Sequence, residues 1–498
     1  MQLRSTIHGR FPFFLLLLPA FIFLHIEKDY SSLINYASGI KEILILFAAP
    51  IAVYAFSWLL YRSVPKANLF SLVFLFFFFF FGDIKDFLSK NIPGSFLQSY
   101  TVLIPLSIVI ISISGIAVKR ATGDFSRLFG FVHLALLLFI AVDLVAMIWP
   151  AKKGVFISDM ADTPPFQPCK TCATPDIYYI LLDEYTSSRN MQEQFGYDNS
   201  AIDNYLEGEG FTIIQSSTSN YNLAAFSMSS IFSLNYLATV DSSKDFYLKN
   251  YLPGVELMYK SPLPGIFATQ GYQVYNNSIF DIRNFPSLTP LTDMWGSKAL
   301  FQQHNMFRKT DNDIGWQFPS WAHIRFSKEI PVPEEQDTRD SLALQKLFSI
   351  AREKSAQPKF VYTHLLSPHF PYIRDSSGIK ITTPKSGDSS FQKKEYIGQV
   401  IYTNRLIRRM VDSIKANNGS SPVIIIQGDH GYRPATRKID ASQFRNFNAM
   451  YFPDSLRPPA ISDSMSSVNT FRFVLNQLFH AHYPLLENRH YFLKYWPL

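Results

Sequence analysis

Residues 176–185 read Asp176-Ile-Tyr-Tyr-Ile-Leu-Leu-Asp-Glu-Tyr185, and they give the clearest indication of the fold class. Its residues 177–182 form an unbroken apolar run that ends at two carboxylates, Asp183 and Glu184. A continuous apolar run of this length is typical of a strand that is buried on both faces, as in a parallel sheet. A second such run, Val423–Ile426, leads directly into Gln-Gly-Asp-His-Gly, so two buried strands are each followed by polar residues.

Further strand and helix patterns alternate along residues 176–498. Further strands are predicted at 360–366 and 448–452, with shorter ones at 211–214 and 272–275, and helices are predicted at 341–354, 396–415 and 468–479. Alternating strands and helices predict an α/β domain with a mostly parallel sheet sandwiched by helices. We therefore assign residues 176–498 to one such domain.

Candidate ligands follow three of the predicted strands. In a parallel sheet, the ligand site lies beyond the carboxyl ends of the strands. Asp183 and Glu184 follow the first strand, His364 lies inside and His369 beyond the strand at 360–366, and Asp429 and His430 follow the strand at 423–426. Carboxylate oxygens and imidazole nitrogens suit Zn or Mn. A single Asp-His-Gly sequence is a common turn, but three strand ends of one sheet that carry carboxylates or imidazoles favour a metal site.

The first 150 residues predict a membrane domain. The chain is 47% hydrophobic, and five apolar stretches precede the α/β domain: 11–26, 43–61, 69–84, 101–118 and 128–149. Since a span needs about 20 apolar residues, we predict five transmembrane helices. A signal peptide is the alternative for the first stretch, but no small-residue cleavage site follows Ile26. The basic residues of the short loops favour a cytoplasmic N-terminus, and thus a multi-pass protein of a bacterial inner membrane with its C-terminal domain outside the cytoplasm.

Charge and composition exclude other classes. The net charge of +7 arises mostly in the membrane part, and the remainder is nearly neutral, which argues against nucleic-acid binding. Transport is weakly supported, because only one carboxylate, Asp143, lies in the interior of a span, and no inverted repeat is obvious. Asp143 is either functional or hydrogen-bonded to a neighbouring helix.

Residues 151–175 form a proline-rich linker that contains Cys169 and Cys172. Two thiolates are too few for a structural zinc site, and no His follows Cys172 for haem attachment. We expect a small local disulfide in an oxidising compartment.

Three motifs together resemble the alkaline phosphatase superfamily, in its sulfatase-like branch. They are DIYYILLDEY at 176–185, HLLSPHFPY at 364–372 and QGDHGYR at 427–433. Five spans followed by such a domain resemble lipoteichoic acid synthases and lipid A phosphoethanolamine transferases. The resemblance implies a metal-dependent transfer in which a side-chain oxygen attacks the phosphorus of a phospholipid head group.

The resemblance also implies residue roles. The metal ligands would be Asp183, with Glu184 as the alternative, together with Asp429 and His430. The substrate anion would be contacted by His369, by His364 less directly, and by Arg433, whose guanidinium can pair with a phosphate. A solvated loop charge is the alternative interpretation of Arg433.

The sequence departs from the family at the nucleophile. Relatives carry it three residues before the serine that aligns with Ser227, which places it at Ala224, and alanine has no nucleophilic atom. The absence of cysteine here also argues against a formylglycine sulfatase. Ser227 is the fallback nucleophile, followed by Ser219 or Thr218. Alternatively, Ala224 is an engineered substitution, or the chain is a natural non-enzyme.

We therefore predict a membrane-anchored, metal-dependent hydrolase or transferase of phosphate or sulfate esters. It would move a phospholipid head group from a membrane lipid donor to an envelope glycan or lipid acceptor. The alternative is a catalytically inactive lipid-binding or sensing protein of the same fold.

Overall fold

The computed structural model describes residues 12–30, 36–92, 94–123, 125–149, 165–237, 245–246, 248–290, 301, 305–314, 332–381, 389–417, 422–433 and 440–495. The chain divides into two compact units, one formed by 1–153 and 292–329 and the other by 154–291 and 330–498. The second unit thus leaves out residues 292–329 of the expected domain of 176–498, and it adds residues 154–175 of the expected linker.

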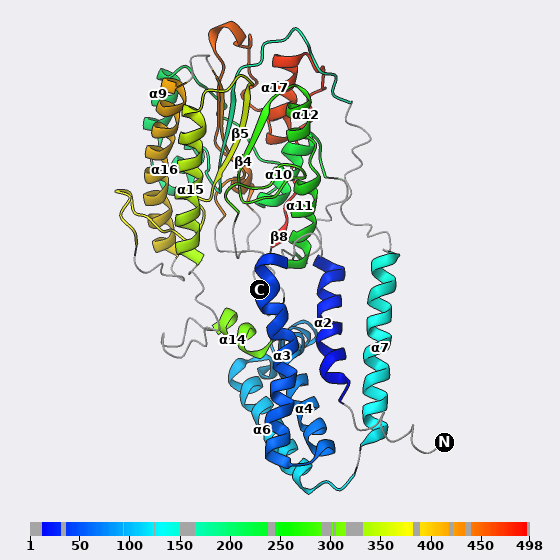
Figure 1. Ribbon diagram of the computed structural model, residues 1–498. Helices are drawn as coiled ribbons and strands as arrows, with labels where there is room; N and C mark the ends of the chain where they lie inside the picture. Colours follow the sequence, from blue (N-terminus) through cyan, green and yellow to red (C-terminus); the bar gives the residue numbers. More distant parts are fainter. Residues whose placement is uncertain are drawn as a thin grey trace. The chain divides into compact units, whose positions relative to one another are not determined.

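The first unit is helical (Figure 1). Its elements are α2 (Phe14–Tyr30), α3 (Tyr36–Tyr61), α4 (Val64–Phe79), α5 (Phe81–Asn91), the short η2 (Phe96–Gln98), α6 (Tyr100–Arg120) and α7 (Ser126–Ile148). Three of them, within 39–61, 100–120 and 126–148, are long and apolar enough to cross a membrane. The pair α4 and α5, bent by 52°, makes up to four. At 17 residues, α2 falls short of a full span.

The helix directions agree with a chain that crosses back and forth. Helices α2 and α7 run parallel, since Phe14 stacks on Phe129 and Phe21 contacts Phe139 further along both. Helices α4 and α6 run antiparallel, since Lys66 at the start of α4 donates to the carbonyl of Lys119 at the end of α6.

Asp143 of α7 is paired with α2. It is 4% exposed, and its carboxylate accepts from Lys28 Nζ at 2.7 Å and lies 3.0 Å from His25 Nδ1. Of the two interpretations of Asp143, this contact supports the bond to a neighbouring helix.

The segment 292–329 joins the first unit through α14 (Met306–Ile314). Phe307 packs edge-on against Phe78, and Lys309 Nζ lies 3.2 Å from Asp86 Oδ1.

The second unit contains a six-stranded sheet in the order β2-β7-β6-β1-β5-β4. Its strands are β1 (Ile177–Leu182), β2 (Thr212–Ile213), β4 (Gln273–Asn277), β5 (Lys359–Leu365), β6 (Val423–Gly428) and β7 (Asn448–Tyr451). Strand β1 pairs in parallel with β5 and β6, and β4 with β5, whereas β7 is antiparallel to both neighbours. The six predicted strands and the mostly parallel sheet are confirmed. A second sheet pairs β3 (Asp245–Phe246) with β8 (Lys494–Tyr495).

Helices cover both faces of this sheet (Figure 1). One face packs on α9 (Ser200–Gly208), α15 (Val332–Arg352) and α16 (Ser389–Asn417), where Tyr178, Ile180 and Leu182 of β1 are fully buried. On the other face, Tyr179 contacts Phe232 and Phe471. These belong to α10 (Ala224–Ser233) and α17 (Thr470–Phe479), with α11 (Leu248–Lys260) and α12 (Leu263–Thr269) nearby. Helix α8 (Ser188–Phe195) follows β1. Successive side chains of β1 thus point to opposite faces of the sheet and pack into two separate hydrophobic cores.

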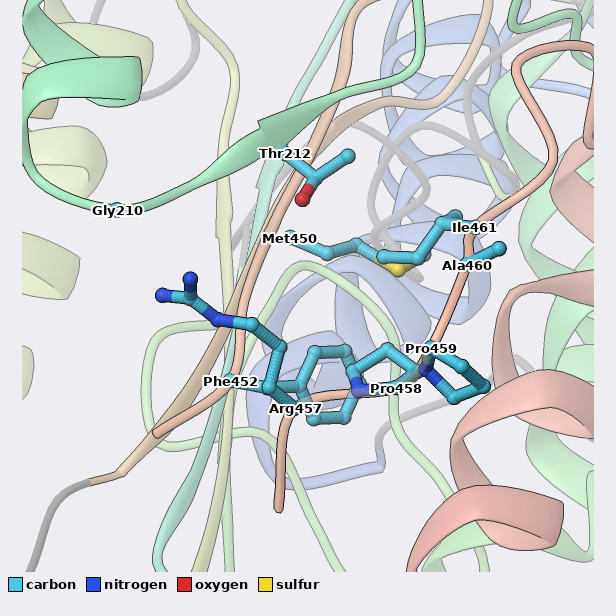
Figure 2. A pocket seen from close by; sticks show the side chains of 9 residues that line it. All are labelled: Gly210, Thr212, Met450, Phe452, Arg457, Pro458, Pro459, Ala460 and Ile461. Atoms are coloured by element: carbon cyan, nitrogen blue, oxygen red, sulfur yellow. The ribbon is translucent and has the colours of Figure 1, made fainter. Parts of the chain in front are cut away.

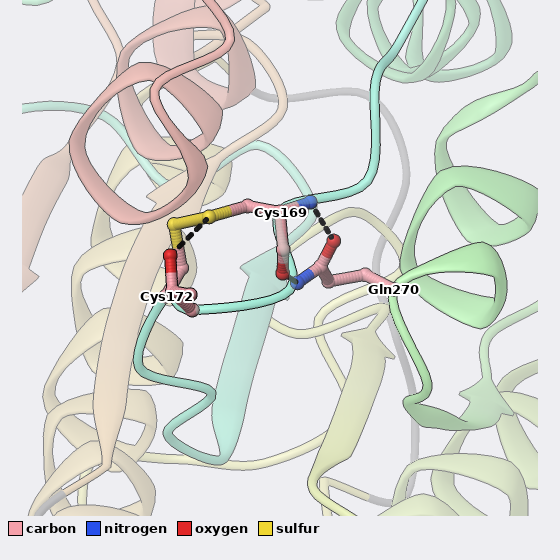
Figure 3. Close-up of a disulfide and its surroundings, with 4 residues drawn as sticks. Cys169, Cys172 and Gln270 are labelled. Atoms are coloured by element: carbon pink, nitrogen blue, oxygen red, sulfur yellow. Dashed lines mark hydrogen bonds between the residues drawn. A yellow bond between two sulfur atoms is a disulfide. The ribbon is translucent and has the colours of Figure 1, made fainter.

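The expected disulfide between Cys169 and Cys172 is present (Figure 3). The side-chain amide of Gln270 accepts from Cys169 N at 2.9 Å and donates to Cys169 O at 2.6 Å. Phe166 also packs against Phe479. The end of the predicted linker is therefore docked on the α/β unit.

Candidate metal centre

The ends of two adjacent parallel strands bring the central carboxylates together. Leu182, the last residue of β1, pairs with Gly428, the last residue of β6. Asp183 and Asp429 follow directly, and both are buried, at 4% and 0% exposure. The parallel register thus explains why residues almost 250 positions apart in the chain meet.

Asp183, Asp429 and His430 form a three-ligand cluster, the one group of this kind found in the described part of the chain. One potential ligand atom from each lies within 4.8 Å of the other two. His430 Nε2 is 3.7 Å from Asp183 Oδ1 and 3.4 Å from Asp429 Oδ2. These three atoms are buried and have no hydrogen-bond partner among the described residues. Orphaned buried acceptors that converge on one point fit a divalent cation.

The outer atoms of two ligands are held by hydrogen bonds. His430 Nδ1 donates to the Gly431 carbonyl at 2.8 Å, so in the neutral ring Nε2 presents its lone pair to the cluster. Asp429 Oδ1 accepts from the backbone N–H groups of Glu184 and His430, at 2.9 and 2.8 Å. Each ligand thus has one free atom, aimed inward.

The loop after β6 requires glycine at two positions. A Cβ atom on Gly428 would lie 2.2 Å from the Tyr185 carbonyl oxygen, and one on Gly431 would lie 2.4 Å from that of Ser442. Both contacts are with backbone, which cannot rotate away. Gly428 therefore lets the chain pass close to the loop after β1, and Gly431 lets it pass close to the segment around Ser442.

The electrostatics of the cluster also favour a cation. Burial, together with the neighbouring charge of Asp183, raises the pKa of Asp429 well above its usual value. Burial lowers the pKa of His430 to about 3, and Arg433 adds to this effect. Burial would raise the pKa of Asp183, but His369, His364 and His430 outweigh it and hold this pKa below its usual value. A bound divalent ion would relieve the repulsion between the two carboxylates.

Glu184 belongs to a second cluster instead. Its φ of +64° is unusual for a residue with a side chain. Its Oε1 accepts from Arg433 N at 2.5 Å, and its Oε2 lies 3.9 Å from His369 Nε2. The three-ligand cluster does not include Glu184. Burial raises the pKa of Glu184, against the opposing effect of His369 and Arg433.

His369 and Arg433 lie together in the structure. Arg433 Nη2 is 2.6 Å from His369 Nε2. His369 Nδ1 donates to the Phe370 carbonyl, so Nε2 is free to accept from Arg433. The His369 side chain is 29% exposed and is thus open to an incoming group.

His364 lies deeper. It is 0% exposed, and its Nε2 is 3.6 Å from Asp183 Oδ2. Its Nδ1 is 3.3 Å from the hydroxyl of Tyr362 on the same strand.

The expected nucleophile position is the first residue of α10. Ala224 is 7% exposed and begins the helix. Ser227, one turn later, is 1% exposed, and its hydroxyl donates to the Asp429 carbonyl at 2.6 Å. The start of α10 therefore lies against the metal-centre loop, and the hydroxyl of Ser227 already has a partner. The Ser219 hydroxyl donates to the Tyr221 carbonyl.

Two residues that hold the histidine loop were not predicted from the sequence. Arg339 Nη2 donates to the His364 carbonyl at 2.8 Å. Asp340 accepts from Leu366 N and Ser367 N, at 2.8 and 2.9 Å. Both are buried on α15, and Asp340 is in line with Ala343 and Leu347 of the apolar stripe. A charged residue on that stripe was the available signal.

A separate cavity of about 300 Å³ lies beside β2 and β7, the two outermost strands on one side of the sheet (Figure 2). It is lined by Thr212, Met450 and Phe452 of β2, β7 and the segment after it, and by the loop of residues 457–461. None of the cluster residues lines it.

The structure thus combines an α/β domain, which has a buried cluster of carboxylates and a histidine at its strand ends, with helices long and apolar enough to cross a membrane. The sulfatase family model matches residues 213–477, more than half of the chain, so this protein belongs to the sulfatase family. The resemblance found in the sequence is thereby confirmed at the family level.

Other comparisons give distant similarities. No curated protein matches the sequence. The zinc complex of the C-terminal periplasmic domain of EcEptC from Escherichia coli is 11% identical, with 65% of this chain and 87% of that chain covered and a TM-score of 0.38. The integral membrane lipooligosaccharide phosphoethanolamine transferase A from Neisseria meningitidis is 11% identical, with 92% and 95% covered and a TM-score of 0.37. A putative sulfatase from Bacteroides thetaiotaomicron is 12% identical, with 64% and 73% covered and a TM-score of 0.38.

Proposed function

We propose that this protein is a membrane-anchored, metal-dependent hydrolase or transferase that acts on phosphate or sulfate esters. The observation that carries this proposal is the buried cluster of Asp183, Asp429 and His430, with its three orphaned ligand atoms, in a chain of the sulfatase family. The ion would be Zn or Mn, and it would supply a Lewis acid that stabilises negative charge on the oxygens of the ester.

The chain's own residues would bind the anion next to this centre. Arg433 presents its guanidinium and His369 its imidazole on an accessible side of the site, and Glu184 accepts from the Arg433 backbone. We assign His369 and Arg433 to the substrate anion, with His364 set back from it by its complete burial.

The donor that fits an apolar anchor is a phospholipid. We propose five membrane spans, with α4 and α5 as one bent span and α2 as a short one. The parallel direction of α2 and α7 supports this number, because an odd count places both on the same course through the bilayer. The α/β unit would then lie outside the cytoplasm at a bacterial inner membrane, where the head group passes to an envelope glycan or lipid.

The second candidate is a lipid-binding or sensing protein without turnover. Ala224 favours it, because this first residue of α10 offers no oxygen to attack the ester. The hydrogen bond from Ser227 to Asp429 also counts against the fallback nucleophile.

The deciding experiment measures diacylglycerol release by the full-length protein. Phosphatidylethanolamine and phosphatidylglycerol vesicles are supplied with Mn or Zn, with Asp429→Ala as the blank and Ala224→Thr in parallel. Release by the unmodified chain, lost in Asp429→Ala and in Ser227→Ala, would support turnover through Ser227. Release by Ala224→Thr alone would establish an intact site that lacks its nucleophile. Release by neither, with vesicle binding intact, would overturn the transferase and favour the lipid-binding protein.

A further inference from the structure

His364 differs from His369, the histidine of the loop after β5, in its burial. It is 0% exposed, whereas the His369 side chain is 29% exposed. A residue that contacts an incoming substrate needs access, which His364 lacks. Its imidazole faces Asp183 instead, with Nε2 at 3.6 Å from Oδ2.

The two oxygens of Asp183 face different partners. Oδ1 is turned toward His430 Nε2, at 3.7 Å, and is one of the orphaned atoms of the cluster. Oδ2 is turned toward His364 Nε2, which has no other partner among the described residues. The gap of 3.6 Å exceeds a good hydrogen bond by a few tenths of an ångström. A small rotation of the carboxylate would close it.

The ring of His364 is held from its other side. Tyr362 lies two residues earlier on β5, so both side chains are on the same face of the sheet. The Tyr362 hydroxyl is 3.3 Å from His364 Nδ1. A hydroxyl that donates to Nδ1 leaves the proton of the neutral ring on Nε2, where it points at Asp183.

The backbone of His364 is fixed as well. Arg339 donates to its carbonyl, and Asp340 binds the two following N–H groups. The imidazole therefore approaches Asp183 from a rigid strand end and not from a mobile loop.

We propose that His364 is a positioning residue, which donates its Nε2 proton to Asp183 Oδ2 and thereby presents Oδ1 to the metal. The inference rests on the proposed metal site. Such partners of a metal ligand fix its orientation, and their loss typically weakens metal binding by about 10- to 100-fold.

The test is the Zn²⁺ affinity of the full-length protein in detergent micelles, measured at pH 7 by competition with a chromogenic chelator. His364→Leu removes the donor and should weaken binding by about 10- to 100-fold. His364→Gln places an amide N–H near the position of Nε2 and should restore affinity to within a few-fold of the wild type. The matched control is Thr363→Val, because Thr363 is equally buried but points to the opposite face of β5.

The outcomes separate this inference from the proposed function. Wild-type affinity in a folded His364→Leu protein overturns the inference, and so does an equal loss in His364→Leu and His364→Gln. If His364→Leu does not fold, Tyr362→Phe decides, since it removes the hydroxyl that selects the tautomer: weaker Zn²⁺ binding supports the role, and unchanged binding overturns it. Absence of Zn²⁺ and Mn²⁺ binding by the wild type overturns both the metal site and the inference. The expected affinity series without diacylglycerol release overturns the transferase alone.

Discussion

Replacement of Asp340 by alanine should destabilise the α/β unit strongly. Asp340 is 6% exposed and accepts three hydrogen bonds, from Leu366 N, Ser367 N and the Ser367 hydroxyl, at 2.8, 2.9 and 2.9 Å. It also lies 3.2 Å from Nη1 of the buried Arg339. Asp340→Ala would leave three buried donors without an acceptor and one buried charge without its counter-ion.

The size of the effect follows from these contacts. Each buried donor left unpaired costs about 1–3 kcal/mol, and removal of one partner of a buried ion pair costs about 3–5 kcal/mol. The terms overlap, because the same carboxylate serves all partners, and they do not add. We expect a loss of about 3–5 kcal/mol, which lowers the melting temperature of a domain of this size by about 6–10 °C.

The assay is thermal unfolding of the full-length protein in detergent micelles, followed by near-ultraviolet circular dichroism of the buried tyrosines. Asp337→Ala is the matched control, since Asp337 lies one turn earlier on α15 and pairs with Arg374 at 2.7 Å. That pair is partly exposed, at 18% and 26%, so it should contribute about 1 kcal/mol or less. A melting temperature for Asp340→Ala within about 2 °C of the wild type, or an equal loss in the control, would refute the reasoning.

Three further predictions concern other parts of the molecule. In the metal-free protein, the pKa of about 3 for His430 means that the unfolded chain binds more protons between pH 6.5 and 3. The free energy of unfolding should therefore decrease as the pH is lowered through that window, by up to about 1.4 kcal/mol per pH unit. His430→Gln should remove this contribution to the pH dependence, as measured by denaturant titrations. In the helical unit, Asp143→Ala should cost about 1–3 kcal/mol in detergent-induced unfolding, because it removes the buried carboxylate that pairs with Lys28 at 2.7 Å, and Lys28→Met in the same chain should recover part of the loss. Joint replacement of Cys169 and Cys172 by serine should cost about 2 kcal/mol, the chain-entropy value for a four-residue loop, and an unchanged melting temperature would contradict that value.

The strands could be predicted because a strand that is buried on both faces has an unbroken run of apolar residues. Residues 177–182 and 423–428 are buried throughout, as their unbroken apolar runs require. The meeting of Asp183 with Asp429 then followed from the shared edge at which parallel strands end. The reversed direction of β7 could not be predicted in this way, because the same apolar residues serve a parallel or an antiparallel neighbour.

The choice between neighbouring side chains could not be predicted. Asp183 and Glu184 are both carboxylates after one strand, and the left-handed backbone at Glu184 decides that only the first faces His430. The pair of Arg339 and Asp340 was hidden for another reason. Charged residues on a helix usually face water, and their burial depends on a histidine loop 25 residues away.

The metal centre and the missing nucleophile are separate questions in physical terms. Two carboxylates at 4% and 0% exposure, with the orphaned Nε2 of a neutral His430 between them, repel each other in a medium of low polarity. Without a cation, this repulsion destabilises the fold. A divalent ion that binds only the folded state would stabilise it, by an amount that increases with the logarithm of the ion concentration divided by Kd. Ala224 changes none of these terms, because it contributes no charge. The expected metal binding therefore holds for an enzyme and for a lipid-binding protein alike, and it is the fate of the ester, not the occupancy of the site, that distinguishes them.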